Sequence, residues 1–350
     1  MGRIRASMAV LLGLALTAAP GAGTPVHAQM RLMSFDQLQG WQDDDHEAAL
    51  AAFRMSCDLI RGDDWGPICA LARDEGAVSH ARGFFELLFR PVMVGQPPAL
   101  FTGYYEPELS GSPVRTARFA HPVYARPPEF DGKGIWHSRT TIEERGLLRG
   151  RGLELAWLED PVEAFFLQIQ GSGRIRMPDG QVMRLGFAAK NNHPYRSIGA
   201  ELIRRGQMAA HAVSAQGIKD WVRRNPAAGA ALLRHNPSFV FFRRLPDLSP
   251  NLGPIGAMGR SVSTLRSLAV DPDHVPLGAP VWMEKTGAAP MNRLMVAQDT
   301  GTAIKGAQRA DIFFGTGHEA GQTAGRVRDG GRMIVLLPLA QALARATETH

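Results

Sequence analysis

Short hydrophobic runs separated by polar turns dominate the last third of the chain. The runs at 279–284 and 332–337 are apolar and are bounded by glycine, proline or aspartate. Runs this short, with no helical spacing between most of them, are typical of strands joined by tight turns. We expect roughly five or six such strands after Pro254, arranged as a small closed barrel.

The segment 294–317 has the clearest pattern of this kind. The apolar run LMVA ends at Gln298 and Asp299, a glycine-containing loop follows, and Asp311 then begins the apolar run IFF. A strand, loop and strand in this order place two carboxylates at facing strand ends. Like charges repel, so each carboxylate disfavours ionisation of the other. Our central hypothesis is that Asp311 is an acid held protonated near neutral pH, with its pKa raised by burial and by Asp299.

The earlier part of the chain alternates between helical and strand patterns. Helical spacing is expected at 45–60, 68–72, 78–90, 138–146, 194–205, 214–224 and 228–235. Strands are expected at 99–112, 121–126, 164–170, 182–188 and from 239 onward, with 164–170 and 182–188 paired as a hairpin. We therefore predict an inserted, β-rich domain at 110–243. The segments 29–109 and 244–345 together form the domain that surrounds it in sequence.

Composition supports a globular protein built mostly from strands and turns. The chain has 350 residues, of which 45% are apolar and 21% charged, with 38 glycines and 24 prolines. This length allows two domains of roughly 150 residues each. The many glycines and prolines disfavour a helical bundle. The predicted class is therefore mainly β with flanking helices, or α+β.

The first 28 residues have the features of a secretory signal peptide. Arg3 and Arg5 precede the apolar run 8–18, and small residues stand near position 28. The run is too short for a transmembrane helix, which needs about 20 apolar residues. There is no cysteine near the expected cleavage point to carry a lipid. We expect an exported, periplasmic protein that is free in solution or associated with the outer membrane.

Two cysteines and a mild basic excess add little about function. Cys57 and Cys69 are expected either to form a disulfide, since the compartment is oxidising, or to remain two buried thiols. Neither has the sequence context of a catalytic cysteine. The formal charge of +6 suits an anionic polymer of the cell surface at least as well as nucleic acid. It therefore does not identify a partner.

Several reaction classes can be weighed against the motifs. Asp299-Thr300-Gly301 resembles one loop of a pepsin-like protease, but such an enzyme needs two, and the chain has one. Asp271, Asp299 and Asp311 could in principle bind Ca²⁺ or Mg²⁺, but no metal-binding or phosphate-binding motif is present. We expect no metal and no cofactor.

The segment 99–112 contains a second set of candidates. Tyr105 and Glu106 allow three interpretations: a core tyrosine beside a surface glutamate, an aromatic ring that stacks on a sugar, or a second catalytic carboxylate. Gln168 and Gln170 are placed on one face of the expected strand 164–170. That face is either a solvated edge or a binding surface.

Six blocks in order give a specific resemblance. TGYYEPELSGS, AFFLQIQGSGRI, AAKNNHPYRSIG, NPSFVFF, SLAVDPDHVPLGAPVW and AQDTGTAIKGAQRADIFFGTG resemble the membrane-bound lytic murein transglycosylase A family over about residues 99–337. The resemblance implies a double-psi β-barrel domain, an inserted β-rich domain, and a groove between them for peptidoglycan glycan strands. It includes the three-aspartate domain, with positions matching Asp271, Asp299 and Asp311. The missing lipid-anchor cysteine is a departure from the family pattern.

The resemblance also implies a reaction. Asp311 matches the family's single catalytic acid, which protonates the glycosidic oxygen and then, as a carboxylate, accepts the proton of the muramic acid C6 hydroxyl. A 1,6-anhydro ring results, with no water consumed. Asp271 and Asp299 are the supporting carboxylates, and the groove candidates are Tyr105, Gln170, Ser172 and Lys305. The alternatives are an inverting glycan hydrolase in which Asp299 activates water, and a non-catalytic wall-binding barrel. No nucleic-acid partner is expected.

Overall fold

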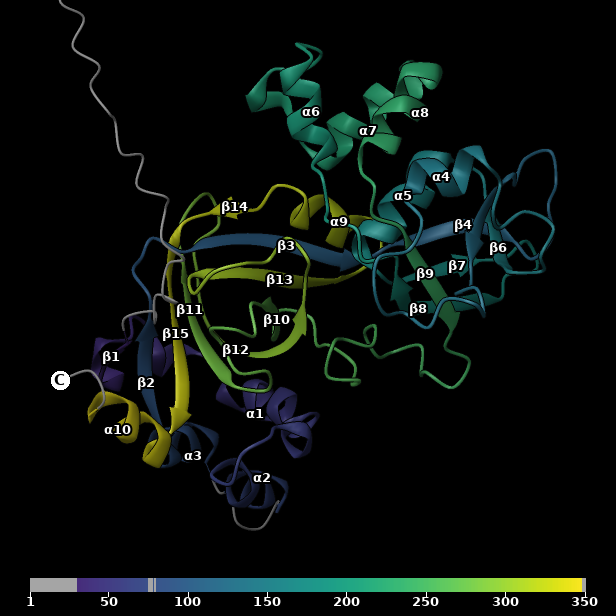
Figure 1. Cartoon of the computed structure of the whole chain (residues 1–350). Coiled ribbons are helices and arrows are strands. Elements are labelled where there is room, and N and C mark those ends of the chain that lie inside the picture. The colour runs from purple at the N-terminus through teal and green to yellow at the C-terminus, as the bar shows by residue number, and fades with distance from the viewer. Residues whose placement is uncertain (1–29, 75–77, 79, 348–350) are drawn as a thin grey trace, which may run out of the picture.

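The chain forms two β-sheets, each with its own helices (Figure 1). The computed structural model describes residues 30–74, 78 and 80–347. The predicted signal peptide lies outside these residues. The expected class, mainly β with flanking helices, is confirmed. None of the described helices has both the length and the apolar content needed to cross a membrane.

The larger sheet has nine strands and defines what we call the large-sheet unit. In spatial order its strands are β1 (Met30–Leu32), β2 (Phe89–Val94), β15 (Gly331–Pro338), β11 (Pro280–Lys285), β12 (Met291–Thr300), β10 (Ser267–Val270), β13 (Arg309–Thr316), β3 (Leu100–Glu106) and β14 (Arg328–Asp329). Its helices are α1 (His46–Arg54), α2 (Trp65–Arg73), α3 (Ala81–Leu88), α9 (His318–Ala324) and α10 (Leu339–Thr347). Pairing among the described strands runs in an open order from β1 to β14, so closure as a double-psi barrel stays a prediction.

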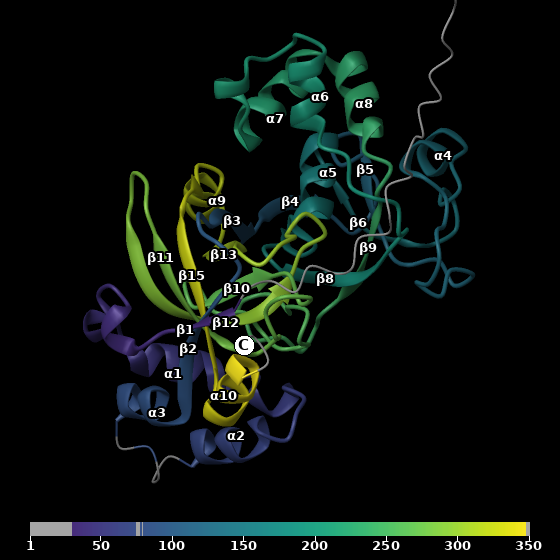
Figure 2. The same ribbon diagram turned by 60° about the vertical axis from the view of Figure 1, so that its left-hand side comes forward.

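The smaller sheet has six strands and defines the small-sheet unit. Its spatial order is β5 (His121–Tyr124), β6 (Glu154–Leu158), β4 (Glu108–Ser112), β7 (Gly173–Arg176), β8 (Val182–Lys190) and β9 (Val240–Arg244). Its helices are α4 (Arg139–Glu144), α5 (Pro161–Gln170), α6 (Ile198–Arg204), α7 (Ala215–Arg224) and α8 (Pro226–His235). In both views α6, α7 and α8 form a separate layer beyond α5 (Figures 1 and 2). The predicted domain limits are compatible with this division but stay a prediction.

The centre of the large sheet has an unusual strand order. β12 and β13 follow one another along the chain, yet β10 lies between them, parallel to β12 and antiparallel to β13. β3, which precedes the small-sheet unit in sequence, pairs in parallel with β13 on its other side. Residues far apart in sequence are thus brought to one edge of the fold, beside the small-sheet unit.

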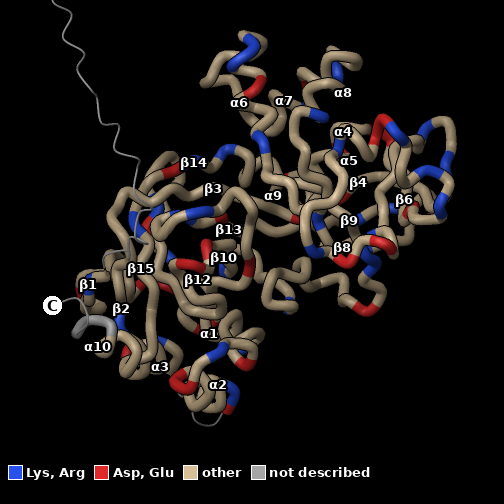
Figure 3. Tube along the Cα trace, viewed as in Figure 1, with Lys and Arg blue, Asp and Glu red and all other residues tan. Residues whose placement is uncertain are grey.

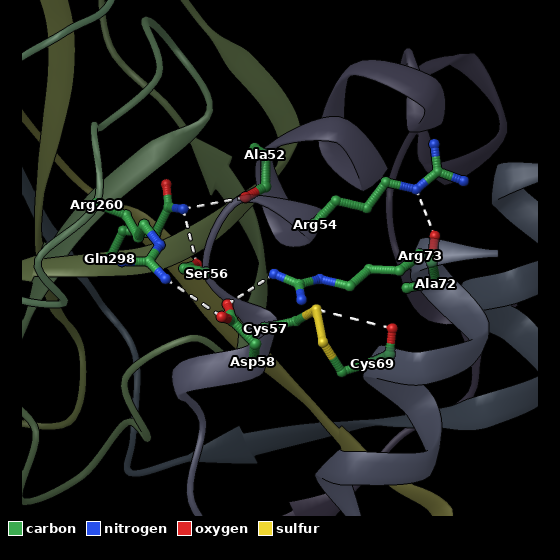
Figure 4. Close-up of a disulfide and its surroundings, with 10 residues drawn as sticks. All are labelled: Ala52, Arg54, Ser56, Cys57, Asp58, Cys69, Ala72, Arg73, Arg260 and Gln298. Carbon is green, nitrogen blue, oxygen red and sulfur yellow. Dashed lines mark hydrogen bonds and ion pairs between the residues drawn. A yellow bond between two sulfur atoms is a disulfide. The ribbon is translucent and has the colours of Figure 1, made fainter. Parts of the chain in front are cut away.

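The main hydrophobic core lies between the large sheet and helices α1 to α3. Phe53, Phe85 and Phe89 contact one another there. The sheet contributes Trp282 of β11, which is fully buried. Burial of each such side chain contributes roughly 1.5–3 kcal/mol. Cys57 and Cys69 form a disulfide with a Cα–Cα distance of 5.4 Å, which joins the start of a short 3-10 helix to α2 (Figure 4).

One predicted strand was wrong. Residues 164–170 belong to helix α5, and the hairpin partner of β8 is instead β7. Asp160 caps the helix by accepting the N–H of Val162, Pro161 occupies its first turn, and Gly171 ends it with a φ of 76°. These are the usual start and stop signals of a helix. Gln168 and Gln170 are therefore not on one strand face.

Other differences concern helix ends and missed elements. The expected helix 78–90 ends at Leu88, because Phe89 begins β2, a strand not expected from the sequence. α9 and α10 are also helices in a region expected to be almost entirely strands and turns. Lys and Arg positions are interspersed with Asp and Glu positions over both units (Figure 3).

Candidate active site

A large cavity lies between the two units. Its volume is about 1350 Å³, and we call it the inter-unit cleft. The large-sheet side is lined by Asp299, Asp311 and residues 300–304. The opposite side is lined by residues 168–172, at the end of α5 and just after it, and by parts of β8 and β9. Typical small-molecule pockets measure about 300–1,000 Å³. The cleft therefore has room for a ligand larger than one sugar.

Strand register brings Asp299 and Asp311 together. Ala269 of β10 pairs with Asp299 on one side and with Asp311 on the other. Directly opposed residues share a face of the sheet, so the two carboxyls point to the same side, two strand spacings or about 10 Å apart at their Cα atoms. Ala269 is buried and small, and it puts little side chain between them.

A β-bulge sets the direction of Asp299. In the parallel pairing of β10 with β12, Leu268 pairs with Ala297 and Ala269 with Asp299, so Gln298 has no partner on β10. Gln298 points into the interior and is fully buried. The Gln298 amide donates to the Ala52 carbonyl at 3.0 Å and to the Ser56 hydroxyl at 2.8 Å, contacts drawn in Figure 4. Bulges re-aim neighbouring side chains. Here the inward turn of Gln298 sends Asp299 toward the cleft.

Asp311 lies in a short hydrogen-bonded chain. The Thr102 hydroxyl donates to Asp311 Oδ1 at 2.5 Å, and Arg309 Nη2 donates to that hydroxyl oxygen at 2.8 Å. Burial raises the pKa of Asp311, while the Thr102 hydrogen bond and the Arg309 charge oppose the rise. The pKa stays above its ordinary value, as a general acid requires. Of the two causes in the hypothesis, burial is the main one, and Asp299 is not among the groups that shift the pKa of Asp311.

Asp299 is the second raised carboxyl. Burial raises its pKa to about 6, the backbone N–H groups of Thr300 and Ala257 and the side chain of Tyr104 oppose the rise, and repulsion from Asp311 adds to it. Both N–H groups donate to Oδ1, at 2.8 and 2.9 Å. Repulsion from Asp311 thus acts on Asp299 in the same direction as burial. As a pair, the two groups keep one proton to a higher pH than ordinary carboxyls.

Asp271 has a different environment. Burial raises its pKa, but the Gly306 N–H at 2.8 Å and the Lys305 ammonium at 2.9 Å outweigh this, so the pKa is lowered. These contacts fasten the loop between β12 and β13 to the end of β10. Neither Asp271 nor Lys305 lines the cleft. The structure thus separates Asp271 and Lys305 from the two cleft acids.

Tyr105 and Glu106 also lie outside the cleft lining. Tyr105 packs so closely on α9 that a Cβ at Gly321 would be 2.6 Å from its ring, and its backbone N–H donates to Gln170 Oε1 at 3.1 Å. Glu106 is 1% exposed and binds Arg174 and Arg184, each at 2.8 Å, as well as the Thr316 hydroxyl. Glu106 is therefore a buried link between the two units.

Four further residues of the cleft lining bear on its function. Gln170 and Ser172 line it, as expected from the sequence. Phe187 and Lys190 of β8 were not expected: Phe187 is 48% exposed, and Lys190 Nζ donates to Thr302 Oγ1 at 3.2 Å, across the cleft. The only sequence signal for Phe187 was an aromatic residue within the expected strand 182–188. No group of three or more His, Cys, Asp or Glu suited to a metal occurs in the described residues.

Comparison with known proteins gives a consistent result. Residues 100–243 match a model described as the MltA specific insert domain, and residues 266–337 match the 3D domain. The membrane-bound lytic murein transglycosylase A of Vibrio cholerae is 34% identical over 250 residues, which cover 68% of this chain and 65% of that relative. The match thus spans slightly less than two thirds of the relative's length.

Solved structures are similar over more of the chain. A membrane-bound lytic murein transglycosylase from Agrobacterium tumefaciens is 33% identical, with a TM-score of 0.80, and the alignment covers 90% of this chain and 99% of the other. The E. coli MltA structure with bound chitohexaose is 29% identical, with a TM-score of 0.69, and the alignment covers 86% and 90% of the two chains. Both domain models and both units are included in this similarity.

Proposed function

Because the chain belongs to the membrane-bound lytic murein transglycosylase A family, we propose that it cleaves peptidoglycan glycan strands as a lytic transglycosylase. The observation that carries the proposal is the position of Asp311, a carboxyl with a raised pKa in a cleft of about 1350 Å³. The oligosaccharide in the E. coli MltA structure supports a glycan as the occupant of the cleft.

The proposed reaction uses Asp311 twice. As an acid, Asp311 gives its proton to the glycosidic oxygen while the bond from that oxygen to the anomeric carbon of N-acetylmuramic acid breaks. As a carboxylate, it then takes the proton of the same sugar's C6 hydroxyl, whose oxygen forms the new bond to the anomeric carbon. The product is a 1,6-anhydro ring and no water is consumed. A positioned general acid contributes about 10²–10⁴-fold to such a step, and intramolecular attack avoids the entropic cost of ordering a second molecule.

Thr102 and Arg309 position Asp311 for both steps. The short bond from the Thr102 hydroxyl fixes Oδ1, so Oδ2 is the oxygen available to carry the proton. Arg309 reaches the carboxylate through Thr102 and favours its charged form after the first step. Asp299 adds negative charge near the developing positive charge on the sugar once it ionises.

A second candidate reaction also has a structural observation in its favour. Asp299 and Asp311 are two strands apart with small Ala269 between them, which leaves room for a water between the carboxyls. Inverting glycosidases have their carboxyls about 6.5–9.5 Å apart for this reason. In that reaction Asp299 would activate water and the new chain end would be an ordinary reducing sugar.

Mass spectrometry of the released fragments separates these reactions. We expect purified peptidoglycan treated with the protein to give ends lighter by one water than the hydrolysis product, and Asp311→Asn to give at least about 100-fold less product. Asp273→Asn is the matched control, since its side chain is 79% exposed and outside the cleft. Ends of hydrolytic mass would favour the inverting hydrolase. Full activity of Asp311→Asn would reject Asp311 as the acid, and no products from the unmodified protein would favour a wall-binding role.

We also propose a periplasmic location, with possible association with the outer membrane. The basis is the predicted signal peptide, together with the names of the relatives, which are described as membrane-bound. Fractionation of cells that express the full chain tests this: the mature protein should lack residues 1–28 and be released with the periplasmic contents. Recovery of an unprocessed chain from the cytoplasm would reject it.

A further inference from the structure

A second cavity lies inside the small-sheet unit, on the other side of α5 from the inter-unit cleft. Its volume is about 1090 Å³, and it is lined by residues of β5, β6, α4, α5, α7 and α8. α5 is a wall of both cavities, and Gln168 lines both. The Gln168 oxygen accepts from Arg139 Nη2 at 2.7 Å and from the Val240 N–H at 3.2 Å. These two hydrogen bonds fix the Gln168 side chain between the two cavities. We call this space the second cavity.

Most charged groups around the second cavity neutralise one another. Arg139 pairs with Glu143 at 3.2 Å, Arg234 with Glu144 at 3.4 Å and Arg223 with Asp160 at 2.7 Å. The Arg139 guanidinium is buried and also donates to two backbone carbonyls. These pairs hold the surrounding helices together and are not available to a ligand.

A second set of polar groups has no such partners. Glu154, Tyr124 and Arg149 line the cavity, and no hydrogen bond or ion pair of their side chains occurs within the described residues. Tyr124 is paired with Glu154 in the β5–β6 register. Burial and Glu154 raise the pKa of Tyr124 to about 12, while Arg149 opposes the rise, so the three groups are electrostatically close. An acid, a hydroxyl and a cation thus face one space.

The remaining lining is apolar and aromatic. Phe165 and Phe239 are buried walls of the cavity, and Trp157 on β6 is partly exposed there. Pockets that hold drug-sized ligands measure about 300–1,000 Å³ and combine apolar walls with a few polar groups. The second cavity has both features, and it can hold a molecule of several amino-acid residues.

We propose that the second cavity binds a short peptide that carries both a free amine and a carboxylate, such as a peptide stem of peptidoglycan. The ammonium contacts Glu154 and the Tyr124 oxygen, the carboxylate contacts Arg149, and an apolar side chain packs on Phe165. The identification of the peptide rests on the proposed function, because peptidoglycan is the polymer that carries such peptides. Since α5 separates the cavities, the bound peptide belongs to a strand other than the one cleaved, or is a free fragment.

Calorimetry with a free stem tetrapeptide tests the proposal. We expect saturable binding to the full chain, with affinity reduced about tenfold or more by Glu154→Gln and by Arg149→Gln, since each removes a charge-assisted contact. Glu159→Gln and Arg145→Gln are matched controls because both residues are exposed and outside both cavities, and they should bind as the unmodified protein does. Absence of binding, or equal loss in the controls, would overturn the proposal.

Blocked peptides provide a second readout that needs no variant. Acetylation of the peptide amine should weaken binding to the unmodified protein about as much as Glu154→Gln, and amidation of its carboxylates about as much as Arg149→Gln. Peptide-free glycan strands should be cleaved at unchanged rates by both variants. If no protein cleaves glycan but the tetrapeptide still binds, the proposed function fails and the peptide site stands. If glycan is cleaved and blocked peptides bind equally well, the peptide site fails alone.

Discussion

The Asp299 carboxyl lies where its charged form is poorly solvated, and this has a consequence for stability. Its pKa is about 6 in the folded protein, against an ordinary value of 3.8. Between about pH 4 and pH 6 the folded protein keeps a proton that the unfolded chain has lost. The free energy of unfolding therefore falls as the pH rises through this window, by at most about 3 kcal/mol.

We predict that Asp299→Asn removes this loss. The asparagine oxygen can still accept the N–H groups of Thr300 and Ala257, since both donate to Oδ1. The melting temperature of the variant minus that of the unmodified protein should be several degrees larger at pH 8 than at pH 4. Thermal unfolding at both pH values checks this. A constant difference between the two proteins would contradict it.

We predict that Asp271→Asn changes stability in the direction opposite to Asp299→Asn. The pKa of Asp271 is lowered in the fold, so its carboxylate contributes stability above pH 4 that is lost as the pH falls through the folded pKa. This variant should be less stable than the unmodified protein at pH 8, and the difference should shrink toward pH 3. Equal behaviour of the two asparagine variants would reject the assignment of both environments.

Ala269 matters because it sits between the two acids. We predict that Ala269→Leu lowers kcat by at least about tenfold, because the larger side chain must displace Asp299 or Asp311 from position, and misplacement by about 1 Å can cost more than this. Overpacking should also cost about 1–3 kcal/mol of stability. Ala269→Gly is the control and should keep most activity. Retained kcat in Ala269→Leu would show that the spacing of the carboxyls is not important.

At the scale of elements, the link between the units is carried by Glu106. Removal of its charge leaves Arg174 and Arg184 without their shared partner, and Arg184 is almost fully buried. We predict that Glu106→Gln destabilises the protein by about 3–5 kcal/mol. Chemical denaturation measures this. Glu108→Gln is the matched control: its pair with Arg176 is exposed, so its loss should cost about 0–1 kcal/mol.

The elements also show what sequence patterns could and could not predict. β12 and β13 were predicted because each contains a short apolar run, one ending at Gln298 and Asp299 and the other beginning after Asp311. α5 was predicted as a strand because the alternation in AFFLQIQ outweighed the helix signals at Asp160, Pro161 and Gly171. Short apolar runs fit both structures, so caps should decide between them.

The candidate site was predictable only where its functional residues lie close together in the sequence. Asp299 and Asp311 were identified together because one loop joins their strands. Thr102 could not be linked to Asp311, because their contact spans 209 positions and depends on the parallel pairing of β3 with β13. Lys305 was assigned to the groove for its charge. Its ammonium instead pairs with Asp271, which follows β10 and lies outside the cleft lining.

At the scale of the whole molecule, both units contribute residues to the cleft in which we propose that a glycan binds. Phe187 lies on the small-sheet side, exposed and facing the same cavity as the acids. We predict that Phe187→Ala raises KM for glycan strands about three- to tenfold with little change in kcat, because loss of a stacked aromatic ring costs about 0.5–1.5 kcal/mol. Steady-state kinetics measure this, with Val182→Ala, on the same strand but outside the cleft, as control. A fall in kcat alone would contradict it.

The pairing of β3 with β13 has a consequence for synthesis. The ribosome adds about 5–20 residues per second, so Thr102 is made about 10–40 s before Asp311, its hydrogen-bond partner 209 positions later. During that interval all six strands of the small sheet, which pair only with one another, are completed. The proposed acid and the residue that orients it are therefore both present only when the chain is nearly finished, and a product truncated before β13 lacks Asp311 altogether.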